Sequence, residues 1–119
     1  MEIPQGHYLY RLGEEGRSVY FVERGSISPL VPLHGGGELR LRKLGPGAVV
    51  GEMDYYDGTP RDADALVTQD GVLWQLPAKT LEQLSRRSPQ QAELFHIMLA
   101  RVMSRRIAQL SDKLRVVLS

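Results

Sequence analysis

The residues best suited to chemistry are a carboxylate and an arginine on either side of a short loop. Glu52 directly follows Gly51, and Arg61 comes nine residues after Glu52. A glycine turn that opens a helical turn leaves backbone N–H groups unpaired, which suits a phosphate. A carboxylate can accept hydrogen bonds from a sugar hydroxyl, and a forked guanidinium can pair with a phosphate. The pattern therefore has the chemistry of a nucleotide site.

Other chemistries find little support in the sequence. The chain has no cysteine, and its three histidines are His7, His34 and His96, far apart and without the spacing of metal ligands. Ser104 and Ser111 have no nearby base, and the acidic residues show no pairing typical of acid–base catalysis. We therefore interpret the chain as a non-enzyme that requires no cofactor and holds no metal.

The elements that position Glu52 and Arg61 are predicted to be strands. All 12 glycines lie in the first 71 residues, where they separate short apolar segments such as residues 18–23, 27–33, 38–44 and 72–76. Several short strands with turn signals between them are typical of a β-barrel or sandwich. Trp74 stands in one of these apolar segments and is expected in the core.

The architecture changes after Gly71. Residues 77–87 are typical of a short helix, and Ser88 followed by Pro89 favours the start of a second helix. That helix is predicted to continue to residue 118, about 45 Å at 1.5 Å per residue. An apolar stripe runs along it: Phe95, Leu99, Met103, Ile107, Leu110, Leu114 and Val117. Because a small barrel covers only part of such a helix, we expect a homodimer through its C-terminal half, with an external domain as the alternative.

Length and charge limit the function classes. With 119 residues the chain suits one domain, and a net charge of +1 argues against a binder of nucleic acid that depends on a basic surface. No apolar run approaches the ~18 residues that a membrane span needs. Arginines on the last helix, with Lys113, form a basic face that is usually solvated.

The segment around Glu52 resembles a known family. Gly51-Glu52-Met53, a loop and then Pro60-Arg61-x-Ala63 are similar to the phosphate-binding cassette of the cyclic-nucleotide-binding domain family, of the catabolite-activator and protein-kinase-A regulatory-subunit type. Residues 20–25 and 44–47 resemble the family's strand and its approach to the cassette. The resemblance extends from about residue 6 to residue 118. The sequence of the segment is most similar to the domain that follows the STAS domain in bacterial SulP-type sulfate transporters.

This resemblance implies a mainly β fold with C-terminal helices. The expected architecture is a jelly-roll-like, eight-stranded β-barrel at about residues 6–76, followed by a short and a long helix at about 77–118. The implied ligand is cAMP or cGMP. The resemblance places it on these residues: Gly51, Glu52, Met53, Arg61, Asp62, Ala63 and Arg106.

The family resemblance also implies a role for several of these residues. Glu52 would hold the ribose 2′-hydroxyl, and Arg61 would neutralise the cyclic phosphate with help from backbone amides at Gly51 and Met53. The long helix closes over the base in family members. Arg106 would then stack on a purine, although a solvated arginine is the alternative reading.

Two aspartates depart from the family's pattern. Asp62 follows the arginine where a small or hydroxyl residue is usual, and Asp64 occupies a place that is often Thr or Ser. Two unit charges 4 Å apart interact by about 4 kcal/mol at an effective dielectric of ~20. Facing the phosphate, Asp62 would oppose the ligand or pair with Arg61; pointing outward, it would leave the cassette intact.

Three hypotheses for the function follow. The first is a regulatory module on the cytoplasmic side of a SulP-type transporter, attached to a transporter or STAS domain. The second is the sensor half of a CRP-type transcription regulator; since no recognition helix precedes Ser119, this chain is not expected to bind nucleic acid. The third is a degenerate domain that serves only protein–protein interaction. The start and end of the sequence favour a fragment of a longer protein.

Overall fold

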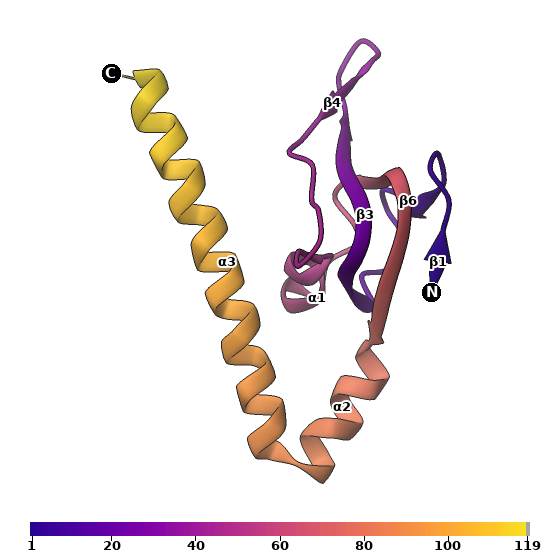
Figure 1. Ribbon diagram of the computed structural model, residues 1–119, viewed down its shortest axis with the longest axis vertical. Coiled ribbons are helices and arrows are strands. Elements are labelled where there is room, and N and C mark those ends of the chain that lie inside the picture. Colours follow the sequence, from indigo (N-terminus) through magenta and orange to yellow (C-terminus); the bar gives the residue numbers. More distant parts are fainter. Residues whose placement is uncertain (119) are drawn as a thin grey trace. The chain divides into compact units, whose positions relative to one another are not determined.

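Six strands form one antiparallel sheet in the first part of the chain (Figure 1). They are β1 (Glu2–Ile3), β2 (Tyr8–Tyr10), β3 (Ser18–Pro32), β4 (Glu38–Arg40), β5 (Val49–Val50) and β6 (Asp64–Pro77). The sheet order is β1-β6-β3-β4, with β2 also paired to β6 and β5 to β3. This computed structural model describes residues 1–118, without the side chains of residues 103, 106, 107 and 109–118.

The two long strands β3 and β6 lie side by side along most of their length (Figure 1). Their register runs from Ser18 opposite Pro77 to Leu30 opposite Asp64 and shifts around Arg24. Gly25 lies at this irregularity with φ 83°, and a Cβ there would collide with the Asp70 carbonyl oxygen. Only glycine fits such a close backbone approach.

The predicted mainly β, jelly-roll-like fold with C-terminal helices is confirmed. The structure has six strands in one sheet that does not close, where an eight-stranded β-barrel was expected. The difference in number arises because β3 and β6 continue through the irregularity near Gly25. If each were divided there, the sheet would have eight strands.

The core of the sheet consists of side chains that alternate along the strands. It contains Tyr10, Tyr20, Val22, Ile27, Val50, Ala65, Val67 and Leu73. The expectation that Trp74 belongs to the core is wrong, since this residue is 66% exposed. Neighbouring residues of a strand face opposite sides, and here Leu73 takes the inward position.

Three helices complete the chain: α1 (Glu52–Asp57), α2 (Ala78–Arg87) and α3 (Pro89–Leu118). The predicted bounds of the last two are confirmed within one residue. The Ala92 N–H donates to the Ser88 carbonyl at 3.1 Å, so Ser88 opens α3 as its sequence position predicts. Residues 1–78 and the residues from 79 on are two compact units.

The apolar stripe of α3 falls into two parts. Leu99 is buried, whereas Met103, Ile107, Leu110, Leu114 and Val117, on which the dimer prediction depends, lie outside the residues whose side chains are described. Within the part of the chain that the structure covers, none of the helices combines the length and apolar composition needed to cross a bilayer.

Candidate functional site

Helix α1 is a short helix bounded by two glycines in the left-handed region. Gly51 precedes it with φ 84° and ψ 7°, and Gly58 ends it with φ 68°, donating its N–H to the Asp54 carbonyl. A side chain at either position would be strained, so the glycines define where the helix begins and ends. Two acidic residues of α1, Glu52 and Asp54, are buried.

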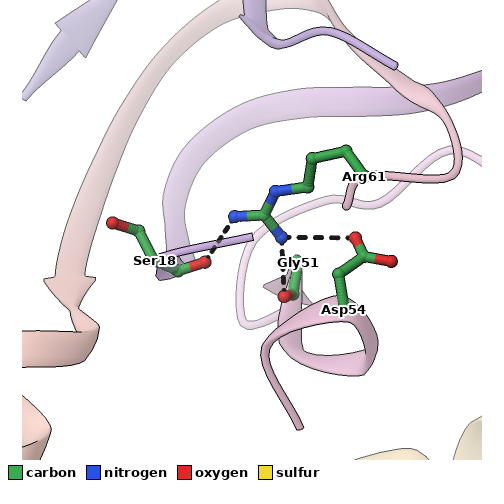
Figure 2. A network of polar contacts seen from close by, with 4 residues as sticks. All are labelled: Ser18, Gly51, Asp54 and Arg61. Carbon is green, nitrogen blue, oxygen red and sulfur yellow. Dashed lines mark hydrogen bonds and ion pairs between the residues drawn. The ribbon is translucent and has the colours of Figure 1, made fainter. Parts of the chain in front are cut away.

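Arg61 is buried beside α1 and makes three polar contacts (Figure 2). Its Nη1 donates to the Gly51 carbonyl at 2.7 Å and to Asp54 Oδ2 at 3.3 Å. Its Nη2 donates to the Ser18 carbonyl at the start of β3, at 2.6 Å. The arginine thus joins both the turn before α1 and the body of α1 to the sheet.

The face of the guanidinium and its Nε atom are also enclosed. The Arg61 Cζ lies 4.2 Å from the centroid of the Tyr10 ring, a cation–π contact. Arg61 Nε is buried and has no acceptor among the described residues. An N–H that is buried without an acceptor is costly, which makes this atom a candidate donor for a ligand.

The backbone of Arg61 fixes the loop before β3. Its N–H donates to the Glu14 carbonyl at 2.7 Å, and its carbonyl accepts the Gly13 N–H at 2.8 Å. Pro60 and Glu15 form a bridge next to this pair. Arg61 is therefore held by hydrogen bonds of both its backbone and its guanidinium.

Gly51 is required by space as well as by its backbone angle. A Cβ at this position would collide with Arg61 Nη1. The short hydrogen bond between the Gly51 carbonyl and the guanidinium depends on that close approach. Gly51 and Arg61, ten residues apart, thus form one unit of the site.

Burial and neighbouring charges shift the ionisation of the acids and tyrosines here. Burial, with a further contribution from the charge of Asp62, raises the pKa of Asp54, while the hydrogen bond and charge of Arg61 oppose that rise. Burial also raises the pKa of Tyr10, against the opposing charge of Arg61. Tyr10 therefore meets the guanidinium as a neutral ring. Burial and the neighbouring Tyr55 raise the pKa of Tyr56 to about 12.

The structure places the predicted site residues in different surroundings. Gly51, Glu52 and Arg61 lie at or beside the start of α1, and Ala63 is buried at the approach to β6. Met53 and Asp62 are exposed, so Asp62 has the outward position that the sequence analysis considered. The side chain of Arg106 lies outside the described residues.

Sequence reasoning missed three parts of this site: Asp54, Tyr10 and the Ser18 carbonyl. Sequence analysis considered Asp62 as the acid that could pair with Arg61, whereas the ion pair in the structure is with Asp54. Asp54 was overlooked because aspartates are normally exposed. Its place in a six-residue helix between two glycines was the available signal.

The chain belongs to the cyclic nucleotide-binding domain family, since the sequence model of that family matches residues 1–88, including α1 and Arg61. This confirms the resemblance at the level of the family.

Similar proteins agree with this assignment. The chain is 34% identical over 93 residues to a cyclic nucleotide-gated potassium channel of Mesorhizobium japonicum, covering 78% of this chain and 24% of the channel. It is 35% identical over 98 residues to the cyclic AMP receptor protein of Thermus thermophilus, covering 82% of this chain and 45% of that protein. The chain thus spans less than half of either relative.

Solved structures show the same fold. A cyclic nucleotide-binding domain from Methylobacillus flagellatus matches with a TM-score of 0.87 at 24% identity, over 94% of this chain and 63% of that one. The catabolite activator protein of Thermus thermophilus matches with a TM-score of 0.72 at 32% identity, over 93% and 52%.

Proposed function

We propose that this chain is a sensor of cyclic nucleotides, either cAMP or cGMP, with the ligand's phosphate bound by α1 and Arg61. The observation that carries the proposal is the family match across residues 1–88. Arg61 adds support, because it is the only basic side chain buried in the part of the chain that the structure describes. A buried guanidinium beside a helix start is suited to an anion.

The roles of the individual residues are part of this proposal. Glu52 accepts the ribose 2′-hydroxyl, and backbone N–H groups at Gly51 and Met53 assist Arg61 at the cyclic phosphate. Asp62 and Ala63 flank the phosphate on the other side of the arginine. Arg106 stacks on the purine from α3.

The donors of Arg61 define how the phosphate would bind. A guanidinium has five N–H groups. In the structure Nη1 donates to Gly51 and Asp54, and Nη2 donates once to Ser18. Nε and the second N–H of Nη2 remain for the phosphate, unless the ligand displaces one of the three protein acceptors.

The ligand signal would pass to a neighbouring domain, as in a regulatory module without catalytic activity of its own. The first candidate neighbour is a SulP-type transporter or its STAS domain, with this chain on the cytoplasmic side. This attachment rests on the sequence resemblance alone, and no relative described above is a sulfate transporter.

A second candidate is the sensor half of a CRP-type regulator, which dimerises through α3. The specific observation in its favour is the 35% identity to the cyclic AMP receptor protein of Thermus thermophilus. The two candidates predict the same ligand and differ in the attached domain. The gene that encodes the chain decides between them, since it shows what precedes residue 1 and follows residue 119.

Calorimetric titration tests the ligand. The chain is titrated with cAMP, cGMP and, as a control ligand, 5′-AMP, whose phosphate is not cyclic. We expect micromolar binding of a cyclic nucleotide and weaker binding of 5′-AMP. If no cyclic nucleotide binds to the folded chain, the proposal is wrong and a role in protein–protein interaction takes its place.

Two variants locate the site. Glu52→Gln keeps an acceptor for the ribose hydroxyl but removes its charge, which costs about 1–1.5 kcal/mol, or roughly fivefold to tenfold in affinity. Glu38→Gln makes the same change at an exposed position of β4 and is expected to leave affinity unchanged. Equal affinities of the two variants would place the ligand elsewhere.

A further inference from the structure

Asp54 has no role in the binding scheme above, although it is the acid that meets Arg61. Its side chain is 8% exposed, and that of Arg61 is 2% exposed. Burying a carboxylate is unfavourable unless it is well paired. A buried acid at the centre of a predicted anion site therefore needs an explanation.

The contact between Asp54 and Arg61 is the weakest of the three that the guanidinium makes. Its length is 3.3 Å, while the bonds to the Gly51 and Ser18 carbonyls are 2.7 and 2.6 Å. A strong charge-assisted bond between nitrogen and a carboxylate oxygen measures ~2.7–2.9 Å. Two backbone carbonyls thus suffice to hold the guanidinium, and Asp54 is not needed to position it.

The surroundings of Asp54 are unfavourable to a second negative charge. Asp62 and Asp57 act on it electrostatically, and Glu52 lies on the same short helix. Arg61 is the cation that opposes them. A bound cyclic phosphate would draw on the same cation as Asp54, and the two anions would repel each other.

We propose that Asp54 is an internal competitor for Arg61, which lowers the affinity of this site for the cyclic phosphate. The inference rests on the proposed function and deepens it, because it names the residue that determines the affinity. Asp54 takes up one Nη1 donor without being required to orient the arginine. Removing its charge leaves the guanidinium in place and makes its full positive charge available to the ligand.

The test compares two variants of the whole chain with the native chain by calorimetric titration with cAMP and cGMP. Asp54→Asn keeps the shape of the side chain and an oxygen that accepts from Nη1, but removes the charge. The matched control, Asp57→Asn, removes the same charge from an exposed residue of α1. Thermal melts show that each variant is folded.

We expect Asp54→Asn to bind a cyclic nucleotide at least about tenfold more tightly than the native chain. The control variant, whose carboxylate is exposed and screened by water, is expected to change affinity by less than about threefold. Binding by Asp54→Asn when the native chain shows none would support the competitor role of Asp54, which would then disable the site, and would mean that the native chain is not a sensor.

Other outcomes overturn the inference in distinguishable ways. If the native chain binds and Asp54→Asn binds equally or more weakly, Asp54 is not a competitor, while the proposed function stands. If neither chain binds although both are folded, the proposed function and the inference fail together. Should Asp54→Asn not fold, Asp54→Ala takes its place, because alanine is compatible with a helix and also removes the charge.

Discussion

Two arginine–aspartate pairs of similar geometry lie at different depths in this protein. Arg61 Nη1 is 3.3 Å from Asp54 Oδ2, and Arg11 Nε is 3.2 Å from Asp64 Oδ1. The Arg11 side chain is 56% exposed and that of Asp64 only 10%, whereas both members of the Arg61 pair are buried. The charged groups are the same, so the comparison shows how burial and the further hydrogen bonds of each pair change what the pair contributes.

The two arginines also have similar aromatic neighbours. Each arginine lies over a tyrosine of β2: the Arg11 Cζ is 3.9 Å from the centroid of Tyr8, and the Arg61 Cζ is 4.2 Å from that of Tyr10. Since strand residues two apart face the same side, regular alternation would place the two tyrosines together. The register of β2 shifts between them, and only Tyr10 is buried.

Burial changes what each pair contributes. An exposed arginine such as Arg11 is solvated with or without its partner, and its ion pair contributes about 0–1 kcal/mol. A buried pair contributes little as a whole, but removing one member leaves a charge without compensation. We therefore expect the protein to tolerate loss of Arg11 and to depend on Arg61.

The largest effect is expected from Arg61→Ala. This change leaves the Gly51 and Ser18 carbonyls without their donor and Asp54 without its cation, and such losses cost about 3–5 kcal/mol of unfolding free energy. Urea denaturation followed by circular dichroism measures it. A loss below about 1 kcal/mol would show that water replaces the guanidinium, and that the pair does not depend on burial.

A smaller loss is expected from Asp64→Ala. Asp64 Oδ1 accepts the Leu12 N–H at 2.7 Å as well as Arg11 Nε, so its removal leaves a backbone donor unpaired. Such a group costs about 1–3 kcal/mol. The matched control is Asp62→Ala at the neighbouring exposed position, for which urea denaturation should show almost no change. Equal losses in the two variants would contradict the importance of the Leu12 bond.

The pH dependence of stability tests the buried pair from the side of the acid. The pKa of Asp54 is raised above its ordinary value of 3.8 in the folded chain, with burial as the first cause. Between these two values the folded state holds a proton that the unfolded state has lost, so stability falls as pH rises through this window. One group changes the unfolding free energy by at most about 1.4 kcal/mol per pH unit.

Asp54→Asn isolates this contribution, because asparagine does not titrate. Urea midpoints of both chains are measured from pH 3.5 upward. We expect the variant to gain stability relative to the native chain as pH rises, and to keep that advantage at neutral pH. If the native chain instead gains stability relative to the variant as pH rises, Arg61 stabilises the ionised carboxylate more than burial destabilises it.

These comparisons also explain which features could be predicted from sequence. The start of α3 at Ser88-Pro89 and the turn at Gly51 depend on local backbone chemistry, so the residues themselves indicate them. The acceptors of Arg61 do not: the Ser18 carbonyl is 43 residues away and joins the site only through the pairing of β3 with β6.

The direction of side chains was the second feature that could not be predicted from the sequence. Residues 72–76 are all apolar except for Gln75, so apolar side chains would lie on both faces of the strand. The sequence therefore does not decide whether Leu73 or Trp74 faces the core. The same uncertainty applied to the aspartates around Arg61. Asp62 was considered either as a partner of the arginine or as an outward-pointing residue, and the packing of α1 makes Asp54 the partner instead.

The smallest effect is expected from Arg11→Ala, and it completes the comparison. Loss of an arginine that is more than half exposed should cost no more than about 1 kcal/mol, since the Leu12 N–H still donates to Asp64. Urea denaturation at low and high salt measures the loss, and salt should reduce it further. A cost as large as that of Arg61→Ala would mean that the aromatic contacts, which both arginines share, contribute more than burial does.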